Sequence, residues 1–201
     1  MQSICVAFKA HMGWVNTVAV RVNTDMPLPL NAQRVDLLGA TSRDVVEPYH
    51  VAGGWSGLER VPRPSNPALV IRRGRRKQVA ATRAQLDVFR EMLKRQDLQW
   101  TRAVMLTARG RLGEDLEHIL GSHAHIHVAE GEAIRDATRA ALEAMNIDQI
   151  DQDEKSILPE ASRHLACADC DTFMKDRRPS GAKSWRKEER MIALGAWLNR
   201  T

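Results

Sequence analysis

A chain of 201 residues is long enough for one sizeable hydrophobic core, with room for a small appendage. Hydrophobic residues make up 43% and charged residues 27%, as in an ordinary globular protein. No stretch approaches the roughly 20 apolar residues of a membrane-spanning helix, and residues 1–13 lack the regions of a signal peptide. We therefore expect a cytoplasmic protein without a membrane partner. The net charge of +5 permits an anionic partner such as nucleic acid without requiring one.

The first part of the sequence predicts strands. Residues 3–9 and 15–22 are rich in β-branched side chains, and Gly13 and Asn16 favour a turn near their junction, so we expect a hairpin. Residues 33–38 are a candidate third strand. The next segment contains glycines and four prolines, which predicts mostly loop over residues 47–67.

A helix with one apolar face is predicted over residues 78–96. Five basic side chains come just before it, within residues 72–77. We interpret them as a solvated turn, with a patch that contacts phosphate groups as the alternative.

The second half of the sequence alternates between strand and helix patterns. Strands are expected at 102–107, at 123–128 and ending at 149–151. Helices are expected at 114–120, 133–145, 154–166 and 186–198, with a polar loop at 171–184. Alternation of this kind implies parallel strands with helices packed on the sheet.

The predicted fold class is therefore α/β, with a mixed central sheet of three opening strands, then strand–helix repeats, and flanking helices. This layout resembles the ribonuclease-H-like superfamily, which includes nucleases, actin-like kinases and a domain of translation termination factors. We expect a ribonuclease-H-like domain over residues 1–150 and a helical C-terminal extension over 151–201 that packs on it. Nucleases of that superfamily place an aspartate in the first strand to hold a metal, whereas Lys9 occupies that region here. Their standard mechanism is therefore not expected.

Four motifs resemble a group of uncharacterised bacterial proteins. They are KAHMGW at 9–14, EPYH at 47–50, SHAHIHVAEGE at 122–132 and WRKEERMIALGAWL at 185–198. Met12 departs from that pattern, in which a small residue is usual. The resemblance implies no particular activity.

The motif at residues 122–132 concentrates groups that could bind a metal. His123, His125 and His127 alternate, so on the predicted strand they would all point to one face. Next-but-one side chains of a strand lie about 7 Å apart, close enough for neighbouring histidines to share a divalent metal. The alternative is a half-buried polar layer bonded to the helices.

Candidate catalytic residues follow from the edge at which parallel strands end. Glu130 comes directly after the predicted strand, and ligands of α/β sheets bind at the carboxyl edge. Lys9 and His11 end the first strand and are expected at the same edge. We therefore predict a catalytic set of Lys9, His11, His127 and Glu130, with a histidine or the glutamate as general base.

Four further residues are candidates for binding the substrate. Thr107 and Arg109 follow a predicted strand at a glycine-containing loop, which suits an anion. Glu132 and His50 complete the set. The alternatives are that Glu132 is a charge in the first turn of a helix and that the loop containing His50 packs over the sheet edge.

Two classes of function remain open. The first is an enzyme of hydrolase or nuclease type that acts on a phosphate-bearing substrate at the carboxyl edge of the sheet, with a divalent metal as candidate cofactor. The second is a non-catalytic module that binds nucleic acid or a translation component through the basic residues at 72–77. The candidate partners are nucleic acid or a phosphate-bearing small molecule, and a homo-oligomer is left open.

Overall fold

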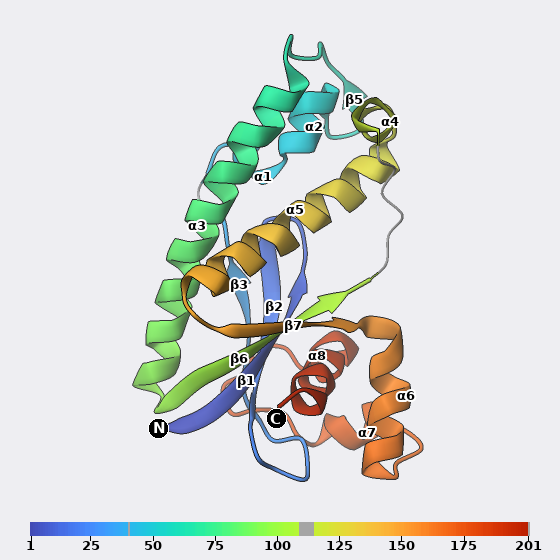
Figure 1. Cartoon of the computed structure of the whole chain (residues 1–201). Coiled ribbons are helices and arrows are strands. Elements are labelled where there is room, and N and C mark those ends of the chain that lie inside the picture. The colour runs from blue at the N-terminus through green and yellow to red at the C-terminus, as the bar shows by residue number, and fades with distance from the viewer. Residues whose placement is uncertain (40, 109–114, 201) are drawn as a thin grey trace.

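The computed structural model describes residues 1–39, 41–108 and 115–200, and its centre is a five-stranded mixed sheet (Figure 1). The strand order is β3-β2-β1-β6-β7. Strands β1, β2 and β3 are antiparallel neighbours, while β6 is parallel to β1 and β7 is parallel to β6. The bounds are Gln2–Ala10 (β1), Trp14–Arg21 (β2), Pro29–Asp36 (β3), Leu98–Thr107 (β6) and Asp148–Asp153 (β7). The predicted α/β fold, with a mixed central sheet of three opening strands, later parallel strands and flanking helices, is confirmed.

Both faces of the sheet are buried, because helices cover each of them. One face packs on α3 (Pro67–Arg95) and α5 (His123–Ala144), with Phe8, Leu86 and Ile134 in the shared core. The other face packs on α6 (Glu154–Leu165), α7 (Cys170–Lys175) and α8 (Lys187–Leu198). Alternate residues of β1 supply the two cores, so Phe8 points to the first face and Ala7 to the second.

Helix α3 begins eleven residues before the predicted start at residue 78. The Asn66 side chain caps it by accepting a hydrogen bond from the backbone N–H of Leu69 at 3.0 Å, and Pro67 occupies the first turn. The basic residues at 72–77 therefore lie on a helix, and their interpretation as a turn was wrong. Arg72, Arg73, Arg76 and Lys77 are exposed.

The strand predicted at 123–128 was also wrong, because these residues form the first turns of α5. Ser122 caps that helix by accepting a hydrogen bond from the backbone N–H of His125 at 3.4 Å. Ile126, Ala129 and Ala133 are buried at helical spacing, so packing favours the helix.

Residues 43–60 form short elements in place of the predicted loop. Two helices, α1 (Arg43–Val46) and α2 (Pro48–Gly53), precede a small hairpin of β4 (Trp55–Ser56) and β5 (Glu59–Arg60). Helix α4 (Leu116–Gly121) lies beside them. The loop predicted at 171–184 likewise contains most of α7.

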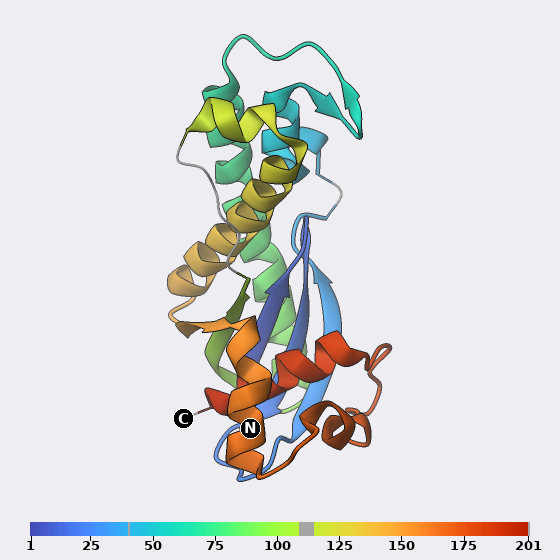
Figure 2. The same cartoon turned by 90° about the vertical axis from the view of Figure 1, so that its right-hand side faces the viewer.

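Helices α2 and α4, the β4–β5 hairpin and the first turns of α3 and α5 form a part of the molecule that we call the helical end. It extends beyond the sheet, while α6, α7 and α8 lie at the opposite end (Figures 1 and 2). It has an apolar cluster of its own, made of Ala52, Ile71, Ile119, Leu120, Ile126 and Ala129. No helix in the described ranges is long and apolar enough to cross a membrane.

Candidate metal centre at the helical end

The four predicted catalytic residues lie in two separate clusters. Lys9 and His11 are bonded to side chains of α6 and α8, on the second face of the sheet. His127 and Glu130 lie on α5 at the helical end, where their neighbour is His50 of α2. The expected single crevice required a strand at residues 123–128. Because those residues are helical, the two clusters share no carboxyl edge.

The first cluster is a network of opposite charges. The ammonium of Lys9 lies 2.8 Å from a carboxylate oxygen of Glu154 and 3.5 Å from one of Glu188. His11 Nε2 lies 3.0 Å from the other Glu188 oxygen, and the His11 ring stacks on Trp14 with 3.8 Å between centroids. A side-chain amide also donates to Glu188, from Asn16. In this network a lysine occupies the space between two carboxylates.

Acidification should weaken this network at Glu188. Partial burial raises the pKa of Glu188, but hydrogen bonds from Asn16 and His11 and the charge of Lys9 bring the pKa below its ordinary value of 4.5. A carboxyl group with a lowered folded-state pKa stabilises the fold above pH 4.5, and this contribution is lost as the pH falls through the folded-state pKa. Glu188→Gln should therefore lose less unfolding free energy than wild type between about pH 5 and pH 3 in urea titrations. The exposed Glu143→Gln is the control, and equal slopes for all three proteins would contradict this account.

The second cluster brings three histidines together. His50 comes from α2, and His123 and His127 lie one turn apart on α5, so their side chains share a face. One ligand nitrogen from each ring lies within 4.8 Å of the other two. His50 is buried, His123 is half-buried and His127 is exposed. The cluster therefore opens from the interior to the surface.

The predicted metal set of His123, His125 and His127 needs one change in light of this geometry. Side chains two residues apart on a helix point in directions about 200° apart. The His125 side chain therefore points away from His123 and His127. Its ring lies against His118, with 4.6 Å between the centroids. His50 takes its place. The sequence offered His50 as a substrate-binding residue, but no local pattern connects it with α5, since the two meet only through packing.

Glu130 is a buried carboxylate that contacts His50 on α2. Its side chain is 1% exposed, and Oε1 accepts hydrogen bonds from the backbone N–H groups of Tyr49 at 2.7 Å and His50 at 3.1 Å. The same oxygen lies 3.4 Å from His50 Nδ1. Within the described part of the chain, Oε2 is buried without a partner. Glu130 thus holds both the start of α2 and the ring of His50.

The surroundings favour the neutral imidazole of His127. Burial lowers the pKa of His127, and the neighbouring His50 and His123 lower it further. Burial also raises the pKa of Glu130, against the opposing effect of its hydrogen bonds from His50 and Tyr49. Neutral imidazole is the form of histidine that binds metals.

The donor set fits a first-row transition metal. Imidazole suits zinc, copper, iron and nickel, and ligating histidines commonly donate their second ring nitrogen to a carboxylate. His50 has such a carboxylate in Glu130. An ion bound at about 2.0–2.1 Å from each nitrogen requires the three rings to move closer to one another. The His127 side chain is exposed and can change its rotamer to do so.

The remaining candidate residues are engaged elsewhere. Thr107, at the end of β6, donates to the backbone oxygen of Gln152 at 3.3 Å. Glu132 forms an ion pair with Arg135 at 2.6 Å. Arg109 lies outside the described residues.

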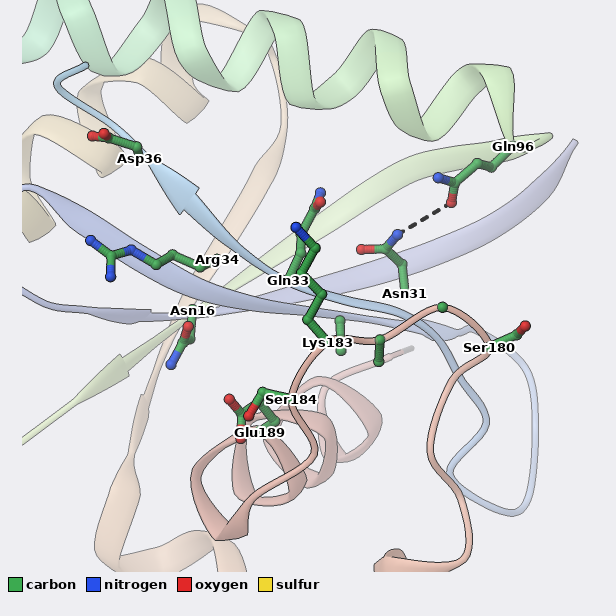
Figure 3. A pocket seen from close by; sticks show the side chains of 13 residues that line it. Asn16, Asn31, Gln33, Arg34, Asp36, Gln96, Ser180, Lys183, Ser184 and Glu189 are labelled. Carbon is green, nitrogen blue, oxygen red and sulfur yellow. Dashed lines mark hydrogen bonds between the residues drawn. The ribbon is translucent and has the colours of Figure 1, made fainter. Parts of the chain in front are cut away.

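Two cavities flank these clusters. One, of about 380 Å³, lies at the helical end and is lined by Tyr49, Ala68, Ile71, Arg72, Arg75 and Leu116. The other, of about 650 Å³, lies between β3 and residues 180–184 (Figure 3). Among its lining side chains, the Asn31 amide donates to Gln96 at 3.2 Å, and none of the predicted site residues that the structure describes lines it.

No protein-family model matches this sequence, and no curated protein matches it. Among solved structures, the chain is similar to a Thermus thermophilus RuvC structure, with 10% identity and a TM-score of 0.49. A second similar structure is T. thermophilus RuvC in complex with a Holliday junction substrate, with 11% identity and a TM-score of 0.43. Both likenesses cover 96% of this chain and 92% of the other. Likenesses this distant leave the function to be argued from the residues.

Proposed function

We propose that this chain is a metal-dependent hydrolase of phosphate esters, with a divalent transition-metal ion bound by His50, His123 and His127. The observation that carries the proposal is the convergence of three ligand nitrogens within 4.8 Å at an opening to the surface. Structural zinc sites are closed by four protein ligands, whereas catalytic sites use three and leave a position for water or substrate. Three histidines with one of them exposed correspond to the second kind.

The chain's own residues have separate tasks in this proposal. Glu130 fixes the orientation of His50 through Nδ1 and so directs Nε2 toward the ion. The lowered pKa of His127 keeps that ring unprotonated and free to coordinate near neutral pH. Arg72 and Arg75 line the neighbouring cavity, where guanidinium groups can hold a phosphate. The bound ion would supply a water whose pKa is near 7.

Metal binding and hydrolysis can be tested with histidine variants. Metal-free protein should take up one equivalent of Zn²⁺ or Co²⁺, and Co²⁺ should give the absorption spectrum of nitrogen ligands. Loss of a ligand in His123→Ala or His127→Ala should weaken binding by more than the roughly 10–100-fold caused by loss of an outer partner. The rate of hydrolysis of bis(p-nitrophenyl) phosphate should fall in the same two variants.

His125→Ala is the matched control, because it removes the same side chain from the same helix but from the opposite face. It should bind Co²⁺ and hydrolyse the ester like wild type. Absence of stoichiometric binding by wild type, or an equal loss in all three variants, would contradict the proposed centre. Metal binding without hydrolysis would contradict the proposed reaction.

The second candidate function is nucleic-acid binding by the exposed basic side of α3. Arg72, Arg73 and Arg76 are exposed, and in the described ranges none of them forms an ion pair with another side chain. Phosphate contacts of this kind are sequence-independent and weaken as salt rises. Duplex binding that falls steeply with salt and persists after metal removal would favour this function.

A further inference from the structure

The cavity of about 380 Å³ at the helical end combines two kinds of lining. Ala68, Ile71 and Leu116 give it apolar walls, and Tyr49 adds an aromatic ring. Two arginines, Arg72 and Arg75, complete the lining. Pockets for small ligands are mostly apolar with a few placed polar groups, and they begin at about 300 Å³. The cavity is therefore large enough for one compact ligand that is partly apolar and partly anionic.

The two arginines differ in their freedom. Arg75 forms an ion pair with Asp136 at 2.7 Å, so a ligand would compete with that carboxylate for it. Arg72 is exposed and, among the described side chains, no carboxylate pairs with it. A phosphate entering the cavity can thus bind Arg72 without displacing a protein partner.

The cavity is joined to the histidine cluster through Glu130. The Tyr49 N–H donates to the same carboxylate oxygen that accepts from His50 N–H. Burial raises the pKa of Tyr49, so its phenol stays neutral. Tyr49, which lines the cavity, thus shares its hydrogen-bond acceptor with the proposed metal ligand His50.

We propose that this cavity binds a nucleotide, with the base against Tyr49 and the phosphate on Arg72. Inorganic phosphate alone would make no contact with the apolar walls, and a purely apolar ligand would leave Arg72 unpaired. A nucleotide combines a planar aromatic base with a phosphate, which is the combination that this lining suits. The proposal deepens the hydrolase assignment and rests on it only for the reaction, because binding itself needs no metal.

Calorimetry with metal-free protein tests the binding directly. AMP should bind, while inorganic phosphate and adenosine should each bind at least about tenfold more weakly, since each has only one of the two parts. Arg72→Ala should weaken AMP binding at least about tenfold and leave adenosine unchanged. Tyr49→Leu should weaken both ligands, and it keeps the N–H that bonds Glu130.

The matched control is Arg95→Ala, which removes an exposed arginine of the same helix that does not line the cavity. It should bind AMP like wild type. AMP binding no tighter than that of phosphate, or an equal loss in Arg72→Ala and Arg95→Ala, would overturn the proposal. A 5′-phosphorylated trinucleotide that binds tighter than AMP would identify a strand end as the natural ligand, and tighter AMP binding a free nucleotide. Because no metal is present, failure here is separate from failure of the hydrolase assignment.

Discussion

Gly74→Ala should lower the free energy of unfolding by about 2 kcal/mol, although alanine is the better helix former. A Cβ at residue 74 would lie 2.4 Å from the backbone oxygen of Asp44 and 2.6 Å from Pro48 Cβ. These distances force α3 away from α1 and α2. The gain of about 1 kcal/mol in helix propensity is smaller than the cost of such overpacking. Urea unfolding curves of the two proteins provide the measurement.

The same substitution should also reduce metal affinity, because the displaced segment carries His50. Gly121→Ala is the control, since a Cβ at residue 121 would have no other atom within 4 Å among the described residues. We expect its unfolding free energy to stay within about 0.5 kcal/mol of wild type, with unchanged Co²⁺ binding. A similar loss at both glycines would show that helix geometry and not close packing sets the result.

Glu130→Ala should have the larger effect on stability, with a loss of about 3–5 kcal/mol. The substitution leaves the N–H groups of Tyr49 and His50 without their acceptor in a buried place. It also opens a cavity where the side chain was. Thermal and urea unfolding measure this loss, and Glu143→Ala provides a control on the same helix. The Glu143 side chain is exposed and forms no ion pair among the described residues, so its loss should cost less than about 0.5 kcal/mol.

Glu130→Gln separates the structural role from the role toward the metal. The amide oxygen still accepts from both N–H groups, and burial already disfavours the charged form of Glu130 by raising its pKa. Stability should therefore recover most of the way to wild type. Co²⁺ affinity should remain about 10–100-fold weaker, because the carboxylate behind His50 is gone. Wild-type affinity in this variant would show that Glu130 has no role toward the metal.

Much of the sheet could be predicted because its strands carry strong local signals. The apolar β-branched runs at 3–9 and 15–22 and the buried run at 102–107 match β1, β2 and β6. The last helix was predicted from its apolar spacing and matches α8. In these segments the local pattern and the tertiary packing favour the same structure.

The errors arose where a local pattern fitted two structures. The alternation in HAHIHV suits a strand, but Ser122 is a helix cap and the apolar positions continue at helical spacing into residues 133–145. Similarly, Asn66 followed by Pro67 marks the start of α3, and the glycine and arginines after it obscured that signal.

The candidate metal centre could be predicted only in part. His123, His127 and Glu130 were chosen from one motif, and the structure places all three beside His50. The pairing with His50 depends on how α2 packs against α5, some 70–80 residues apart in sequence. Neither the spacing nor the composition of the sequence predicts this packing. For the same reason, the sequence does not predict that Lys9 and Glu130 lie in separate clusters.

The arrangement of the two cores has a consequence for synthesis on the ribosome. Strands β1 and β2 are made first, but the helices that cover Cys5, Ala7 and Val18 on the second face lie within residues 154–198. About three-quarters of the chain must therefore emerge before that apolar face can be covered. A nascent chain that stops before α8 exposes a continuous hydrophobic surface, which favours association with other chains or with a chaperone.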